Sequence, residues 1–104
     1  MADGREYVAD VITQLTGNKG KIVGVYPAGA EAVDKMIEGF NSISKKFYLK
    51  TQAGTEAAKE CVDLFNEVIA AVDNGGDVAA KFEAFAGPSN TFITTAANLV
   101  IRMT

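Results

Sequence analysis

The sequence predicts an all-α protein, a compact bundle of four to five helices joined by short glycine-rich loops. Three observations favour this class. Apolar residues recur at steps of three and four along most of the chain. Glycine-containing breaks separate these stretches. The one strand-like run, residues 22–26, has no obvious hairpin partner. The 104 residues correspond to one helical domain, 1–104, long enough to bury a core without disulfides or metals.

The first half of the chain predicts two helices. The first covers residues 4–16, with Gly17 as its C-cap. Residues 17–29 contain four glycines and one proline, and we expect them to form a packed loop. A short strand at 21–26 is the alternative there, and it would make the protein α+β. The second helix covers residues 30–48, where Gly39 could permit a close helix crossing.

The second half predicts a helix over 55–73, with Thr55 as its N-cap and Asn74-Gly75-Gly76 as its end. Asp77 is expected to cap a short helix that continues to about Ala86.

The last part of the chain follows a predicted break at residues 87–90, because Gly87-Pro88 is a helix-ending signal. We expect a final helix over residues 91–103, with a strand as the alternative because Thr and Ile are frequent there.

The composition excludes several chemistries. The chain has no histidine, so no catalytic triad, Cys-His pair or histidine metal site can form within it. Cys61 is the only cysteine and lies in an apolar run, where it is expected to be a small buried hydrophobe. The run Gly17-Asn18-Lys19-Gly20-Lys21 lacks P-loop spacing. The Asp73–Asp77 loop lacks EF-hand spacing. We therefore expect no catalytic residues, no metal site and no cofactor.

The charge and targeting signals indicate a cytoplasmic protein. The formal net charge is −3, which provides no overall attraction to nucleic acid or anionic lipid. The first ten residues carry four charges and no apolar core of a secretion signal. No stretch of 18 apolar residues is present, so we expect no membrane association.

The segment 91–103 is the strongest indication of a partner. On a helical wheel its apolar residues cover an arc of roughly 200°, against about 100° for an ordinary surface helix. Such a helix either lies at the centre of the bundle or faces another chain, since subunit interfaces are apolar and poor in charge. The predicted partner-binding residues are Phe92, Ile93, Ala97, Val100 and Ile101.

A second candidate surface is basic. No acidic residue lies between Gly39 and Thr55, and this stretch contains Lys45, Lys46, Tyr48 and Lys50, the predicted nucleic-acid contacts. Lysines interleaved with aromatic residues can hold a phosphate backbone and stack on bases. The competing interpretation is that the lysines stabilise a helix C-terminus while Phe47 lies in the core.

A row of acidic residues, Glu56, Glu60, Asp63 and Glu67, is expected on the outer side of the helix 55–73. It forms either a solvated face or a docking surface for a partner.

The leading functional hypothesis is a small non-catalytic helical subunit that acts by self-association or by docking into a larger complex. Its partners would be copies of itself or other proteins, and the basic segment 45–50 could touch a nucleic acid within such an assembly. One alternative is a carrier that holds a small apolar ligand between helices, lined by the six phenylalanines. Another is an enzyme whose site only the fold assembles. No internal repeat and no family resemblance point further.

Overall fold

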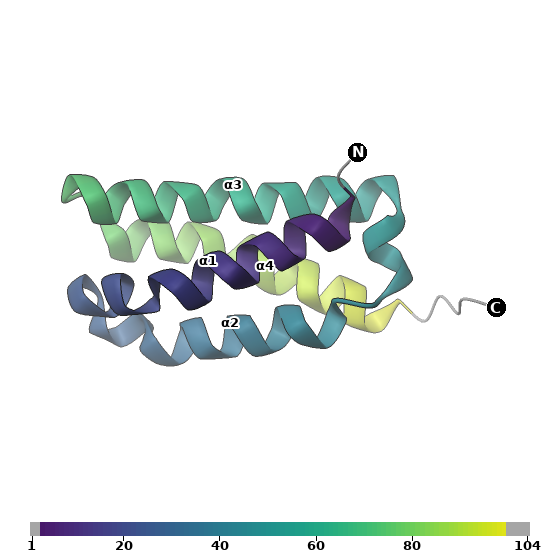
Figure 1. Cartoon of the computed structure of the whole chain (residues 1–104), viewed down its shortest axis with the longest axis horizontal. Coiled ribbons are helices and arrows are strands. Elements are labelled where there is room, and N and C mark those ends of the chain that lie inside the picture. Colours follow the sequence, from purple (N-terminus) through teal and green to yellow (C-terminus); the bar gives the residue numbers. More distant parts are fainter. Residues whose placement is uncertain (1–2, 100–104) are drawn as a thin grey trace.

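The computed structural model describes residues 3–99, and within this range the protein is all-α. Residues 3–99 form four α-helices and two short 3₁₀ helices, and no strand occurs among them. Figure 1 shows how the four labelled helices pack together. In chain order they are α1 (Gly4–Val25), η1 (Pro27–Gly29), α2 (Ala30–Ile43), η2 (Phe47–Lys50), α3 (Gln52–Asn74) and α4 (Val78–Asn98). The predicted compact helical bundle is therefore confirmed.

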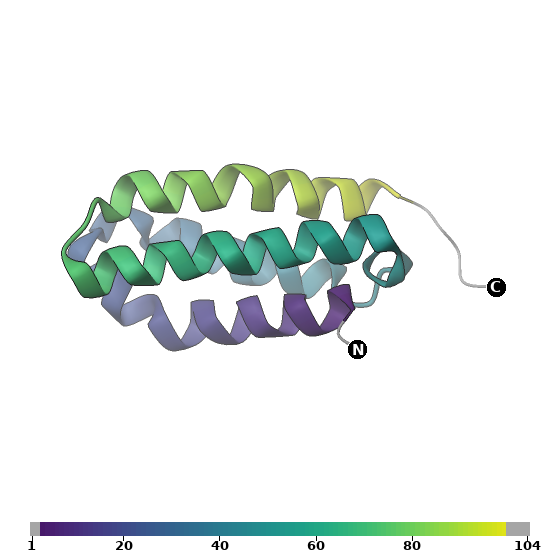
Figure 2. The ribbon, with the colours of Figure 1, turned by 90° about the horizontal axis from the view of Figure 1, so that it is seen from above.

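Successive helices run in opposite directions, as the colours in Figures 1 and 2 show. The most extensive interfaces join α1 to α3 and α3 to α4, with smaller ones joining α1 to α2 and α2 to α4. Helices α2 and α3 therefore lie diagonally opposite each other. The crossing segment, residues 44–51 with η2 inside it, connects them over one end of the bundle. We call this the η2 end, where α1 and α3 begin and α4 finishes.

The core is one continuous cluster to which all four helices contribute. Five of the six phenylalanines are 0–3% exposed. Their rings pack edge to face or tilted: Phe65 lies 5.1 Å from Phe85, and Phe82 lies 5.8 Å from both Phe85 and Tyr26, between ring centroids. Aromatic pairs at these distances add to the free energy gained from burial.

Helix α1 is longer than the sequence indicated. It continues through Gly17 to Val25, so the predicted C-cap, the packed loop and the strand at 21–26 are all wrong. The continuation keeps Ile22, which is completely buried, on the same side as Leu15, seven residues and two turns earlier. Burial of one apolar side outweighs the weak helix propensity of glycine.

Helix α2 is shorter than the predicted 30–48 and ends at Ile43. The next residues form the crossing segment, and η2 replaces the last predicted turn. Within this helix, Glu31 and Lys35 form an ion pair four residues apart at 3.0 Å. Gly39 does permit a close crossing, because a Cβ atom there would lie 2.9 Å from the Ile93 side chain of α4.

Helix α4 does not break at Gly87-Pro88. It includes Pro88 in its interior and runs to Asn98, so residues 91–98 are helical rather than a strand. Pro88 removes the N–H that would bond the carbonyl of Ala84. Four of its buried residues nevertheless share one side across the proline: Phe85, Ser89, Phe92 and Ala96. Packing on this side holds the two halves in one helix.

The helix caps agree in part with the sequence. The side chain of Asp77 accepts from the N–H of Ala80, as predicted for the start of α4. Gly75, with φ of 70°, ends α3 in the left-handed region. The N-cap of α3 is Thr51 rather than the predicted Thr55, and its hydroxyl accepts from the N–H of Gly54. The prediction missed it because the apolar pattern begins only at Ala58.

Substituting the exposed glycines of α1 with alanine should stabilise the protein. A Cβ atom at Gly17, Gly20 or Gly24 would have nothing within 4 Å. Each change to alanine should raise the free energy of unfolding by about 0.5–1 kcal/mol, because alanine loses less backbone entropy in a helix. Urea denaturation followed by circular dichroism measures this. Gly54→Ala is the control and should destabilise, since its Cβ would overlap the Tyr48 carbonyl. A loss of stability at all three exposed positions would contradict the prediction.

Candidate functional site

The crossing segment packs closely against the first turns of both α1 and α3. Gly4 and Gly54 let its backbone approach both helices closely. A Cβ atom at Gly4 would overlap the carbonyl oxygen of Leu49, and a Cβ atom at Gly54 would overlap the carbonyl oxygen of Tyr48. The Leu49 side chain is completely buried beneath the segment. The segment therefore closes the η2 end of the core and has little freedom to move as a body.

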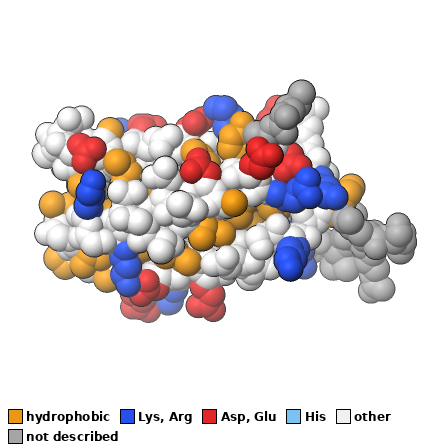
Figure 3. All heavy atoms as spheres, in the orientation of Figure 1, with side chains coloured by type: hydrophobic (Ala, Val, Ile, Leu, Met, Phe, Trp, Pro, Cys, Tyr) orange, Lys and Arg blue, Asp and Glu red, His pale blue; other side chains and the backbone are white. Residues whose placement is uncertain are grey.

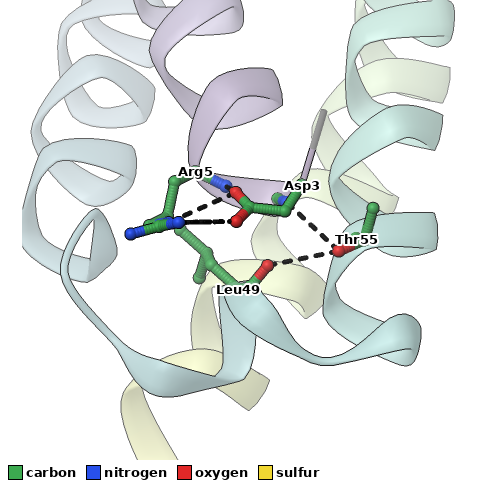
Figure 4. A network of polar contacts seen from close by, with 5 residues as sticks. Asp3, Arg5, Leu49 and Thr55 are labelled. Carbon is green, nitrogen blue, oxygen red and sulfur yellow. Dashed lines mark hydrogen bonds and ion pairs between the residues drawn. The ribbon is translucent and has the colours of Figure 1, made fainter. Parts of the chain in front are cut away.

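Thr55 connects three parts of the η2 end through one hydroxyl (Figure 4). Its oxygen accepts from the N–H of Gly4 at 3.1 Å, and its O–H donates to the carbonyl of Leu49 at 3.2 Å. Beside it, Asp3 caps α1 and pairs with Arg5 at 2.7 Å. The side-chain hydrogen bond from Arg5 is the largest cause that lowers the pKa of Asp3 below its ordinary value.

Three lysines of the crossing segment lack ion-pair partners. The sequence has ten Lys and Arg residues, and nine lie in the described range, which excludes Arg102. Five of the nine form ion pairs with carboxylates. Within residues 3–99, those without a carboxylate within 4 Å are Lys21, Lys45, Lys46 and Lys50. The unpaired positive charge of the described chain is thus concentrated at the η2 end.

Phe47 is exposed, which corrects the interpretation that it belongs to the core. It is 36% exposed, whereas the other five phenylalanines are buried. Leu99 follows the last residue of α4 at the same end and is 37% exposed. An exposed aromatic ring on a rigid segment is typical of the apolar anchor in a protein interface. Sequence periodicity does not reveal it, because the apolar pattern predicts one continuous helix over residues 30–48 and places Phe47 on its buried side.

The structure brings the two predicted partner surfaces together. Tyr48 of the basic set packs against Phe92 of the apolar set, with ring centroids 6.0 Å apart. Tyr48 is half-buried, so its ring is engaged inside the chain, while Lys45, Lys46 and Lys50 are exposed. Phe92 also packs on Phe40 at 6.2 Å. The side chains of Phe92 and Tyr48 therefore lie beneath the exposed lysines of the crossing segment and support them.

The other predicted partner residues have different environments. Ile93 is half-buried and covers Gly39 of α2. Ala97 is exposed on the last turn of α4. Val100 and Ile101 lie outside the described residues. Of the predicted partner residues that the structure describes, Phe92 and Ile93 are covered by other parts of the chain. Ala97 faces solvent.

The acidic row on α3 is exposed as predicted, but its two halves differ. Asp63 pairs with Lys59 at 2.8 Å, and Glu67 pairs with Lys81 of α4 at 3.1 Å. The hydrogen bond that Lys59 donates to Asp63 is the main cause that raises the pKa of Lys59. Within residues 3–99, Glu56 and Glu60 have no ion pair. The half of the row nearest the η2 end is the unpaired half (Figure 3 shows charges of both signs at this end).

Cys61 lies in the core next to Ser89 of α4. Both are essentially inaccessible to solvent. Burial is the main cause that raises the pKa of the Cys61 thiol, and the Ser89 hydroxyl beside it partly offsets this effect. The Ser89 oxygen makes no hydrogen bond of ordinary geometry. Sequence analysis predicted a buried hydrophobe at position 61, and the burial is confirmed.

The described residues provide little support for a metal site, an enclosed ligand cavity or a membrane-spanning helix. Residues 3–99 contain no cluster of three or more potential metal ligands. A surface hollow of about 350 Å³ lies on α2, lined by Lys35, Glu38, Gly39 and Ser42, and it is wide open to solvent. None of the helices described here combines the length and apolar composition needed to cross a bilayer.

Comparisons with known proteins identify no relative: no family model matches the chain, and neither does any curated protein or solved structure.

Replacing Thr55 with valine should destabilise the fold. Valine keeps the shape but removes the bridge, leaving the N–H of Gly4 and the carbonyl of Leu49 without this partner. The expected loss is about 1–3 kcal/mol in free energy of unfolding, measured by urea denaturation. Thr16→Val is the matched control, because the exposed Thr16 hydroxyl bonds only to its own helix. Equal effects of the two substitutions would contradict the bridging role.

Cys61 should be unreactive in the native protein. Because the thiol is buried and its raised pKa keeps it protonated, Ellman's reagent at pH 8 should modify it only as fast as the fold opens. In urea the same thiol should react immediately. Gly54→Ala, which weakens the fold, should accelerate the native reaction. A rate equal to that of a free model thiol in the folded protein would contradict this prediction.

Proposed function

We propose that the chain is a small non-catalytic helical subunit that acts by association, and that it docks onto its partner through the η2 end. The observation that carries this proposal is the grouping of Lys45, Lys46 and Lys50 beside the exposed Phe47 on a fixed backbone. An exposed ring with unpaired charges around it has the composition of a protein interface, apolar at its centre and polar at its rim.

The rigid backbone of the crossing segment also supports the proposal that this surface binds the partner. Ordering a mobile loop upon binding reduces affinity, whereas a segment fixed beforehand avoids that loss. Here Gly4, Gly54 and the Thr55 bridge fix the backbone, while the lysine side chains stay free. The partner that fits is an acidic protein surface with some exposed apolar area.

A nucleic acid is the second partner class. Lys45, Lys46 and Lys50 favour it, since no acidic residue interrupts this part of the chain. Three lysines supply only a few phosphate contacts, and the engaged ring of Tyr48 leaves only Phe47 to stack on a base. We therefore rank it below a protein partner.

The carrier and enzyme alternatives have less support. Five phenylalanines fill the core against one another and against other side chains, and dense packing of this kind leaves little room for a ligand. The resolved pKa shifts of the described residues belong to surface ion pairs and to one buried thiol. They do not form a catalytic cluster.

Carbodiimide cross-linking in an extract of the source cells tests the proposal, because this reagent joins a lysine to a carboxylate in contact with it. Lys45, Lys46 and Lys50 should form intermolecular links to carboxylates of a partner, and mass spectrometry identifies the linked peptides. Lys21 is the matched control, since it is also exposed and unpaired but lies far along α1 from the η2 end. Links at Lys21 as frequent as those at the η2 end would count against the proposal.

Nuclease treatment of the same extract separates the two partner classes. If the links persist after digestion, the partner is a protein in direct contact. If digestion abolishes every link at the η2 end, the contact depends on a nucleic acid, and the ranking given above is wrong.

A further inference from the structure

The η2 end carries unpaired charges of both signs. Lys45, Lys46 and Lys50 provide the positive charges, and Glu56 and Glu60 provide the negative ones within the first turns of α3. None of these five forms an ion pair within residues 3–99. Farther along α3, the acidic residues Asp63 and Glu67 do have lysine partners, as described above. Lys21 and six other carboxylates within residues 3–99 also lack an ion pair, so the η2 end is distinguished by three unpaired lysines and two unpaired glutamates at the same end as the exposed Phe47.

We infer that the partner of the η2 end is a second copy of this chain, with the lysines of each protomer facing Glu56 and Glu60 of the other. This inference rests on the proposed function and names its partner. In a two-fold symmetric dimer the same patch is used by both subunits, so that patch must be complementary to itself. Adjacent positive and negative sets meet this requirement, because rotation by 180° places each set opposite the other. Phe47, on the same segment as the lysines, would lie near the centre of the contact.

The charge balance favours a second copy over a polyanion. The chain has a net charge of −3, and Glu56 and Glu60 lie in the first turns of α3 at the same end as the lysines. A nucleic acid that approached the lysines would meet these two carboxylates, and the repulsion would reduce its affinity. A second copy instead uses both sets at once. The overall repulsion between two such chains is weak at physiological salt, where charges more than about 8 Å apart are largely screened.

The size of the end face suggests a weak, reversible dimer. The cross-section of the molecule is 26 by 20 Å. Covering such a face buries roughly 500 Å² per protomer, or about 1,000 Å² in total, at the lower limit of specific interfaces. Phe47 and Leu99 supply its apolar part. We therefore expect a dimer that forms at micromolar concentrations and dissociates on dilution or in high salt.

Charge reversal tests the inference. One double variant, Lys45→Glu with Lys46→Glu, reverses two of the three unpaired lysines. The other, Glu56→Lys with Glu60→Lys, reverses both unpaired glutamates. All four side chains are exposed, so both variants should keep the helical circular dichroism of the wild type. Sedimentation velocity from micromolar to near-millimolar concentration should show a dimer for the wild type, and only monomer for each variant alone.

An equimolar mixture of the two variants should restore the dimer, because each reversed set then faces its complement. The control, Asp73→Lys with Glu83→Lys, changes the net charge as much as the basic variant does, but on exposed residues outside the η2 end. It should dimerise like the wild type.

A wild type that remains monomeric at every concentration overturns the inference, and so does a dimer that neither charge reversal weakens. If links from Lys45, Lys46 or Lys50 to another protein persist in the source extract, the proposed function stands without this partner. If those links are also absent, both fail. Loss of the dimer in both variants and its return in the mixture would establish the contact, since a folding defect in either variant would not be repaired by mixing.

Discussion

The close backbone contact between the crossing segment and the first turns of α1 and α3 is the constraint on which the rest of the η2 end depends. The carbonyls of Tyr48 and Leu49 occupy the space where side chains at Gly54 and Gly4 would be. This approach lets the Thr55 hydroxyl reach both the first N–H of α1 and the Leu49 carbonyl. It also lets Leu49 close the core. Without it, α2 could not connect diagonally to α3 by so short a path.

This constraint separates the roles of neighbouring residues along the segment. Leu49 faces inward, and the backbone N–H groups of Lys46, Leu49 and Thr51 are hydrogen-bonded, while the Lys46, Phe47 and Lys50 side chains face solvent. In the 3₁₀ helix 47–50, residues three apart lie on the same side, so Phe47 and Lys50 share a side that differs from that of the buried Leu49. An exposed aromatic ring here has a geometric cause, and the proposed docking surface would give it a function.

The sequence predicted those features that local chemistry determines. The Asp77 cap and the glycine end of α3 both form. The errors share a cause, since each depended on contacts between distant residues. Gly17 is helical because Ile22 beyond it is buried, and Pro88 is helical because residues on both sides of it pack into one core. The N-cap at Thr51, and with it the new role of Thr55, could not be foreseen without knowing where the crossing segment lies.

The same tertiary contacts change which surface of the protein is expected to bind a partner. The wide apolar arc on the final helix predicts a partner on that helix. In the structure, however, Phe92 is buried and Ile93 rests on Gly39. The described turns of this helix are therefore largely covered by α2 and the crossing segment. Because successive helices alternate in direction, the end of α4 arrives beside the crossing segment. We therefore propose the exposed ring and unpaired charges of the η2 end, and not an apolar helix face, as the surface for association. An interaction there would depend on charge, so salt and charge reversal should control it more strongly than loss of apolar area from α4.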